Sequence, residues 1–303
     1  MNNYFQEHSN REERYRSFNR VIKPEEVRYQ IFGQLPASKE EYFDTAKLYF
    51  QQRSRIFPRP HEAPTDPIQL PNWKEFIPCT ENFNEFPESQ LILGIIDSYQ
   101  IQAQRAGYIS GLNPVMVSGI SLTRDNRIIL GVRGGTIEPN KISLIPMGFV
   151  SYNPLYSQNL LHDSVYAETE EELGWKKDQL DKTDLVGLVL GDKNEPTYKN
   201  SVKFVFLLYN NITTSTEVLQ RHNEAIILYN ELTEKGLIKK EIEAQLIEKG
   251  FYESAWEHKR LLSLEPSYQN LNRIVKEGLF KNHQLIDMAR SDVALAMTLL
   301  KNI

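Results

Sequence analysis

Cysteine is almost absent from this sequence, because Cys79 is the only one among 303 residues. No intramolecular disulfide can form, and the simplest interpretation is a reducing, cytoplasmic location. Long apolar runs are also missing, since stretches such as residues 91–96 are far too short to span a bilayer. The first residues are polar and lack the apolar segment of a signal peptide, although a specialised export route would not need one. We therefore expect a soluble protein without a membrane segment.

An excess of positive charge is missing too. Lys and Arg number 35 against 40 Asp and Glu, which gives a net charge of −5. Such a chain has no overall basic field to hold nucleic acid or an anionic membrane. The six histidines are scattered and none has a partner at zinc-ligand spacing. Nucleic acid is therefore not an expected partner. A small molecule is expected instead, because its binding needs only a few basic side chains.

The composition divides the chain into three parts. Residues 1–30 are rich in Arg, Glu and Asn with little periodicity, which predicts a flexible or helical arm. Residues 31–112 form an N-terminal extension, in which apolar spacing predicts a helix over 39–55 and a buried strand over 91–96. A proline-dense connector separates the two. Residues 113–303 form the main domain.

The main domain is rich in strands around one acidic helix. Apolar alternation predicts a hairpin over 115–133, a third short strand ending at Gly148, and strands over 185–190 and 202–209. Helical spacing predicts helices over 158–173 (closed by Gly174), 217–249 (broken at Lys235-Gly236), 267–277 and 284–301. The predicted fold class is α+β, or mixed α/β, with a helical insertion at about 217–249 and a C-terminal helix.

The segment LLHDSVYAETEEELGW, residues 160–175, carries the most information about function. On a helix, Glu168, Glu171 and Glu172 fall within an arc of about 100° on one face, whereas Glu170 points elsewhere. Carboxylates this close repel one another, and they lie near the negative end of the helix dipole. A hard divalent cation removes that repulsion, and Mg²⁺ suits oxygen ligands shared with substrate phosphates. A solvated acidic surface is the alternative that the charge run alone favours.

The acidic helix resembles the second half of the Nudix box. The Nudix hydrolase family carries G-x5-E-x7-R-E-U-x-E-E-x-G-U, where U is bulky and apolar, and residues 167–175 here read AETEEELGW. The resemblance implies a mixed sheet sandwiched by helices, with Glu168, Glu171 and Glu172 as ligands of Mg²⁺ or Mn²⁺. It also implies that Gly148, at the end of the sequence PMG, is the box glycine that enters the substrate site.

The resemblance has departures. Ala167 stands where the family has arginine, and Thr169 stands where it has a bulky apolar residue. Strict spacing places Asn159 at the first glutamate, and use of Gly148 as the box glycine lengthens the loop. In the family, the first glutamate and the arginine form a supporting ion pair. Loss of both partners leaves no lone buried charge, so the supporting residues around the metal ligands are expected to be rebuilt.

The order of elements also resembles a smaller, atypical Nudix branch that hydrolyses UDP-glucose and UDP-galactose. Members of that branch likewise lack the box arginine, and they have an N-terminal extension and a late segment with tryptophan and acidic residues. The matching late segment here is ESAWEHKRLLSLEPS. The resemblance implies that a nucleoside-diphosphate-linked small molecule, a UDP-sugar first, is the substrate. A homodimer is a candidate assembly.

Further candidate residues lie outside the acidic helix. Arg133 ends a predicted strand, where the family often places a basic residue near the substrate. Tyr198 and Lys199 lie in the loop after the box and could stack on a base or contact phosphate. Glu253 or Glu257, beside a tryptophan, could supply an extra acid as general base or metal ligand. Each candidate has an ordinary alternative. Arg133 could be a surface charge at a strand end, Tyr198 and Lys199 could belong to a polar hairpin loop, and the late acid could be an exposed glutamate.

The leading hypothesis is metal-dependent hydrolysis of the diphosphate to a nucleoside monophosphate and a sugar phosphate. One of Glu171, Glu172 and Glu253 would accept the proton of the attacking water. A second hypothesis is a non-catalytic Nudix-like module that senses a nucleotide or binds a protein, which the missing arginine and the charged helices favour. A third is an enzyme acting on capped RNA, which the overall acidity disfavours.

Overall fold

The structure is a computed structural model, and it describes residues 15–32, 76–80, 83–97, 101, 112–134, 138–150, 159–191 and 200–300. The helix expected over 39–55 and the candidate residues Tyr198 and Lys199 lie outside these ranges. Within the described ranges, no helix combines the length and the apolar character that a membrane crossing requires.

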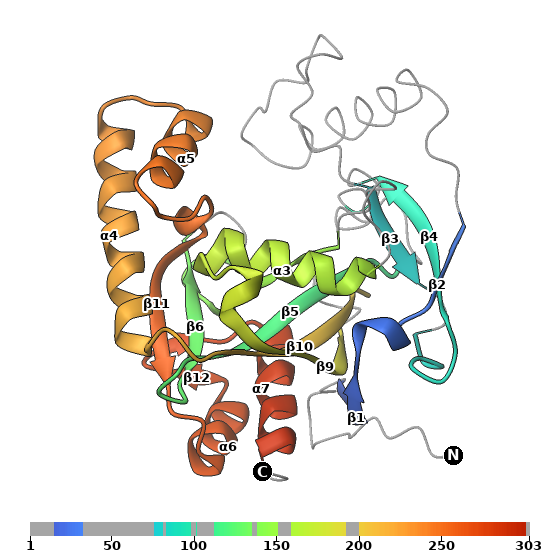
Figure 1. Ribbon diagram of the computed structural model, residues 1–303. Helices are drawn as coiled ribbons and strands as arrows, with labels where there is room; N and C mark the ends of the chain where they lie inside the picture. The colour runs from blue at the N-terminus through green and yellow to red at the C-terminus, as the bar shows by residue number, and fades with distance from the viewer. Residues whose placement is uncertain are drawn as a thin grey trace, which may run out of the picture.

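One mixed sheet of eight strands organises the main domain (Figure 1). Its order is β1-β9-β10-β5-β6-β11, with β7 beside β6 and β8 beside β5. Strands β5 and β10 run parallel, and every other neighbouring pair in this sheet is antiparallel. The strands are β1 (Tyr15–Ile22), β5 (Val115–Leu122), β6 (Ile128–Arg133), β7 (Ile142–Leu144), β8 (Met147–Phe149), β9 (Leu180–Leu190), β10 (Val202–Asn210) and β11 (His258–Leu264). The predicted hairpin and the two later strands are confirmed.

For residues 15–22, strand β1 corrects the expectation of a flexible or helical arm over residues 1–30. Residues Tyr15–Ile22 form an edge strand that pairs antiparallel with β9. The register shifts between Ser17 and Ile22, so the buried side chains of this strand do not follow a regular period of two. The irregular spacing is the physical reason why the sequence pattern did not predict a strand.

The single strand predicted to end at Gly148 is divided into two short strands in the structure. Strand β7 pairs with β6, whereas β8 pairs with β5, so the chain changes partners at Ile145-Pro146. Pro146 has no N–H to donate, but its carbonyl accepts a hydrogen bond from the Gly119 N–H at 2.9 Å. This change of partner places Gly148 beside β5, opposite Val117.

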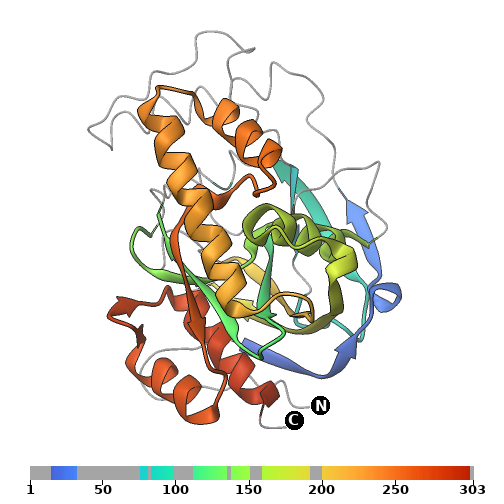
Figure 2. The same ribbon diagram turned by 60° about the vertical axis from the view of Figure 1, so that its left-hand side comes forward.

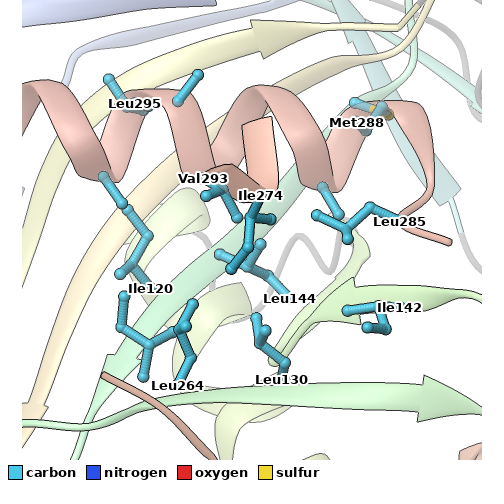
Figure 3. Close-up of a cluster of buried hydrophobic side chains, with 14 of the residues drawn as sticks. Ile120, Leu130, Ile142, Leu144, Leu264, Ile274, Leu285, Met288, Val293 and Leu295 are labelled. Atoms are coloured by element: carbon cyan, nitrogen blue, oxygen red, sulfur yellow. The ribbon is translucent and has the colours of Figure 1, made fainter. Parts of the chain in front are cut away.

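The two faces of the sheet pack against different helices. Along β10, Phe204, Phe206 and Leu208 face the core that contains α3 (Leu160–Leu173), and the alternating residues face the core that contains α7 (Asp287–Leu300). Figure 3 shows the second core, where α7 and α6 (Tyr268–Glu277) cover Ile120 and neighbouring strand residues. The mixed sheet flanked by helices confirms the predicted fold class.

A smaller sheet of three strands lies beside the first turn of α3 (Figure 1). Its order is β2 (Tyr29–Phe32), β4 (Leu91–Asp97) and β3 (Phe76–Thr80), which confirms the strand predicted over 91–96. The Tyr29 hydroxyl accepts a hydrogen bond from the Leu161 N–H at 3.2 Å. One of the N–H groups that a helix start leaves unpaired is thereby satisfied by the first residue of β2.

The segment predicted as a helical insertion forms two helices, of which the first packs against β11 at the edge of the sheet and the second packs against the first (Figure 2). Helix α4 (Ser215–Glu234) and helix α5 (Lys239–Glu248) are separated by a turn in which Gly236 has a φ of 82°. A glycine is favoured there because side chains disfavour positive φ. Helix α4 starts at Thr214, whose side chain forms a capping box with Glu217, and Asp125 in the β5–β6 turn accepts hydrogen bonds from Ser215.

Candidate active site

Helix α3 positions the acidic residues, and its ends are held by distant segments. Gly174 closes it in the left-handed conformation at φ 66°, as the sequence predicted, and the Gly174 N–H donates to the Glu170 carbonyl. Asn159, which stands at the place of the first box glutamate, makes no side-chain cap. Thr169 is fully buried, and its hydroxyl donates to the Val165 carbonyl at 2.5 Å, so a polar residue is tolerated at an apolar position.

The box glutamates of α3 differ in exposure, although they share a helix face. Glu172 is 3% exposed, Glu168 is half-buried, and Glu171 is exposed, like Glu170. The difference arises because α3 lies along the sheet, so the inner edge of the acidic face is covered and the outer edge is not. The arc predicted from the sequence therefore spans from the core to the surface.

Glu172 is a buried carboxyl with an incomplete set of partners. The Met147 N–H donates to this carboxyl, but its Oε2 atom has no hydrogen-bond partner among the described residues. Burial raises the pKa of Glu172 well above its ordinary value, and the charges of Glu257 and Glu168 raise it further, whereas Arg133 and the Met147 hydrogen bond lower it. A proton or a cation is needed to neutralise this group.

Gly148 and Glu168 lie in direct contact. A Cβ atom added to Gly148 would lie 1.9 Å from Oε1 of Glu168 and 2.1 Å from its Cδ. The Glu168 carboxyl therefore rests on the Cα of Gly148, a position that no residue with a side chain could occupy without moving it. The structure thus brings together the glycine and one of the glutamates that the sequence assigned to one site.

Replacement of Gly148 by alanine is expected to lower the hydrolysis that the box resemblance implies by about 10-fold, because the added methyl displaces the Glu168 carboxyl. The fold should survive, because the three atoms nearest to the added methyl all belong to the flexible end of the Glu168 side chain. Steady-state rates and thermal unfolding of Gly148→Ala, beside the wild type, measure both effects. An unchanged rate would show that the position of the Glu168 carboxyl does not matter.

The late segment contributes Glu257 to the site. The Ser254 N–H donates to the Glu171 carbonyl at 3.1 Å, and the Gly134 N–H donates to the Glu257 carbonyl at 2.7 Å. The short helix η5 (Ala255–Glu257) is thereby held between the end of α3 and the end of β6. Glu257 is half-buried and its charge acts on Glu172, whereas Glu253 is exposed. Of the two late acids, Glu257 is the one that the fold places beside the helix.

Arg133 supplies positive charge at this place. It ends β6 opposite His258, and its charge lowers the pKa of both Glu172 and Glu257. Burial has the largest influence on the pKa of Glu257 and raises it. The charge of Arg133 and, to a smaller extent, that of Lys239 lower this pKa. Ala167, at the position of the family's arginine, is exposed. The positive charge beside the acids therefore comes from a neighbouring strand.

Sequence reasoning missed a buried polar network behind these acids. The Tyr252 hydroxyl lies 2.6 Å from Nδ1 of His222 on α4, and the Tyr252 side chain packs on Gly174 at the end of α3. Nε2 of His258 lies 3.2 Å from the Ser143 hydroxyl. The contacts join residues far apart in the chain, and no local spacing signals them. The network fixes the late segment against α3 and the sheet.

Acidification is expected to destabilise the fold through two buried, uncharged histidines. Burial lowers the pKa of His162, on α3, and of His222 to about 4. The unfolded chain takes up protons at these rings below pH of about 6.5, so stability present above that value is lost as the pH falls toward 4. Each of the two rings should lower the free energy of unfolding by about 2 kcal/mol when the pH falls from 7 to 5.

Urea unfolding of the wild type and of His162→Leu at the two pH values measures this loss. Both nitrogens of His162 lack a partner among the described residues, and the ring packs edge-on against Phe206 at 4.9 Å, so leucine removes no hydrogen bond. The same pH dependence in both proteins would contradict the assignment to His162.

The box resemblance implies a divalent metal at this site. Within the described ranges, no group of three or more His, Cys, Asp or Glu side chains is gathered closely enough to hold a metal ion. The available donors nevertheless fit a hard cation, because Glu172 has an unpaired buried oxygen and its neighbours Glu168 and Glu257 are also carboxylates. Glu171 can add a ligand only from the exposed side.

Comparisons with known proteins give a fold similarity. No protein-family model matches the sequence, and no curated protein is significantly similar to it in sequence. Similar solved structures include Tm1382, a proposed Nudix hydrolase, which is 12% identical, with 76% of this chain and 92% of that chain covered and a TM-score of 0.41. A bifunctional NMN adenylyltransferase/ADP ribose pyrophosphatase from Francisella tularensis is 12% identical, with 73% and 51% covered and a TM-score of 0.35. A MutT/nudix family protein from Enterococcus faecalis is 14% identical, with 63% of each chain covered and a TM-score of 0.33. Similarity at this level concerns the fold alone.

Proposed function

We propose that the protein is a Nudix-type, metal-dependent pyrophosphatase that hydrolyses a nucleoside diphosphate linked to another group, with UDP-sugars as the first candidates. The observation that carries the proposal is the buried Glu172, whose free oxygen faces no hydrogen-bond donor among the described residues. An uncompensated buried carboxylate is costly, so such a group is retained where a ligand completes it. The neighbouring acids and Arg133 favour a cation shared with a diphosphate.

Glu168 and Glu172 would hold Mg²⁺ or Mn²⁺, with Glu171 added from the surface side. A metal held by these residues would supply positive charge that stabilises the diphosphate during hydrolysis. Arg133 lies beside the same acids and can bind a phosphate oxygen. Gly148 leaves room for the Glu168 carboxyl to remain at its place.

Glu257 is the residue that we assign as proton acceptor. Water attacks phosphorus, its proton passes to a carboxylate oxygen of Glu257, and the phosphoanhydride bond breaks to release a nucleoside monophosphate and a sugar phosphate. Burial makes Glu257 a stronger base, while Arg133 and Lys239 favour its ionised form. This assignment places Glu257 where Glu253 was expected from the sequence, because Glu253 lies on the exposed surface.

The second candidate function is a nucleotide-binding module without catalysis. It is favoured by the absence of a preformed group of three metal-binding side chains in the described part of the chain, together with Ala167 and Asn159 in the box. Such a module would bind nucleotide and metal with no product formed.

The test is incubation of the full chain with Mg²⁺ or Mn²⁺ and a panel of UDP-, ADP- and GDP-sugars and dinucleotide cofactors. These conjugates resist phosphatase, so coupled phosphate release reports only hydrolysed products. Chromatography of the same reactions identifies the nucleoside monophosphate. Turnover of one class supports the pyrophosphatase and names its substrate. If calorimetry detects binding of a conjugate and none of the conjugates is hydrolysed, the result supports the non-catalytic module.

A further inference from the structure

The start of helix α5 lies against η5, beside the acids. The Lys239 Nζ atom lies 3.8 Å from the centroid of the Trp256 ring. The same Nζ lies 3.4 Å from Oε1 of Glu243 one turn later, and 58% of the Lys239 side chain is exposed. Both contacts are of kinds that contribute little at exposed sites, so an incoming anion can displace them at small cost. Lys239 is therefore an available cation.

Trp256 is held rigidly next to the proposed reaction centre. The Gly134 N–H donates to the Glu257 carbonyl at 2.7 Å, and a Cβ atom on Gly134 would lie 3.1 Å from the Trp256 carbonyl oxygen. The backbone of η5 is thus packed on the end of β6, and the indole is half-buried. Its Nε1–H is covered and has no acceptor among the described residues. A rigid, half-exposed indole is a good surface for stacking.

The charges at this place are ordered from the core outward. Glu172 is buried, Glu257 is half-buried beside it, and the cations Arg133 and Lys239 both act on Glu257. A substrate whose diphosphate lies at Glu172 therefore meets a second cation and an indole as it extends toward α5. In a nucleoside diphosphate-sugar the nucleobase is the flat aromatic ring, and flat rings stack on indole.

We propose that Lys239 and Trp256 form the subsite for the nucleoside end of the substrate, with Lys239 on its phosphate and Trp256 stacked on its base. This subsite rests on the proposed function for its position relative to the diphosphate. It assigns the helical insertion α4–α5 a role in recognition, since the insertion delivers Lys239 to η5. The sugar end then lies on the other side of the acids.

The test measures binding separately from hydrolysis. Calorimetry with Mg²⁺ and either UMP or AMP is compared with glucose 1-phosphate for the wild type, Lys239→Met, Trp256→Leu and Trp256→Phe. Lys240→Met is the matched control, because Lys240 is the exposed neighbour on α5. We expect Lys239→Met and Trp256→Leu to weaken nucleoside monophosphate binding by about 10-fold each. Trp256→Phe keeps a ring and should stay near the wild type, as should Lys240→Met.

The outcomes are distinct. Unchanged nucleotide affinity in Lys239→Met and in a folded Trp256→Leu overturns the subsite. Selective loss of glucose 1-phosphate binding also overturns it, because the sugar end would then occupy this place. A wild type that binds no nucleotide overturns both proposals. Nucleotide binding that depends on Lys239, in a protein that hydrolyses none of the conjugates, supports the subsite and contradicts the proposed hydrolysis.

Discussion

Replacement of Glu172 by glutamine should lower turnover by about 1000-fold and, at the same time, make the metal-free protein more resistant to heat. Burial and two neighbouring carboxylates raise the pKa of Glu172, so its charged form opposes folding as the pH rises above its ordinary value of 4.5. Glutamine has nearly the same shape without the charge. The substitution therefore removes a cost to folding together with the proposed metal ligand.

Thermal unfolding with and without Mg²⁺, measured beside steady-state rates, separates these two effects. The wild type should gain stability from Mg²⁺, whereas Glu172→Gln should gain little because the metal has lost a ligand. Glu170→Gln is the matched control, since Glu170 lies on the same helix with an exposed side chain. Near wild-type turnover and an unchanged response to Mg²⁺ in Glu172→Gln would remove Glu172 from the proposed metal site.

Local spacing predicted the acidic helix well because everything needed to see it lies within one segment. The helix, its closing Gly174 and the shared face of the glutamates follow from a period of 3.6 residues. Local spacing could not show that Glu172 is buried while Glu171 is exposed, because that depends on how α3 lies on the sheet. The contact between Gly148 and Glu168 likewise joins two elements across a loop.

The supporting residues could not be predicted, since each comes from a distant part of the chain. Tyr29 on β2 accepts a hydrogen bond at the start of α3, and Tyr252 of the late segment packs on its end. The choice between Glu253 and Glu257 depends on the turn of η5. Glu253 lies on the surface, whereas Glu257, four positions later, lies at the site. The sequence made Arg133 a candidate only because it ends a predicted strand. Its influence on the pKa of Glu172 and Glu257 follows from the fold.

A fully buried ion pair is the second feature that sequence patterns did not reveal, and it lies on the opposite face of the sheet from α3. Lys203 on β10 and Asp292 on α7 are both 0% exposed, and Nζ lies 2.5 Å from Oδ2. The Lys203 Nζ also lies 3.5 Å from the Met288 carbonyl oxygen and 4.0 Å from the Met147 sulfur. Met147 is the residue whose N–H donates to Glu172. The pair therefore joins α7 to the strand that supports the acids.

Asp292→Ala is expected to lower the free energy of unfolding by about 3–5 kcal/mol, because it leaves the Lys203 ammonium buried without its counter-charge. The double variant Lys203→Met/Asp292→Leu should recover most of that loss, since two apolar side chains of similar size need no compensation. Urea unfolding of the wild type, Lys203→Met, Asp292→Leu and the double variant completes the cycle. A double variant as unstable as the sum of the singles would mean that each side chain acts separately. Recovery of stability without recovery of turnover would show that the pair also positions Met147, and through its N–H the carboxyl of Glu172.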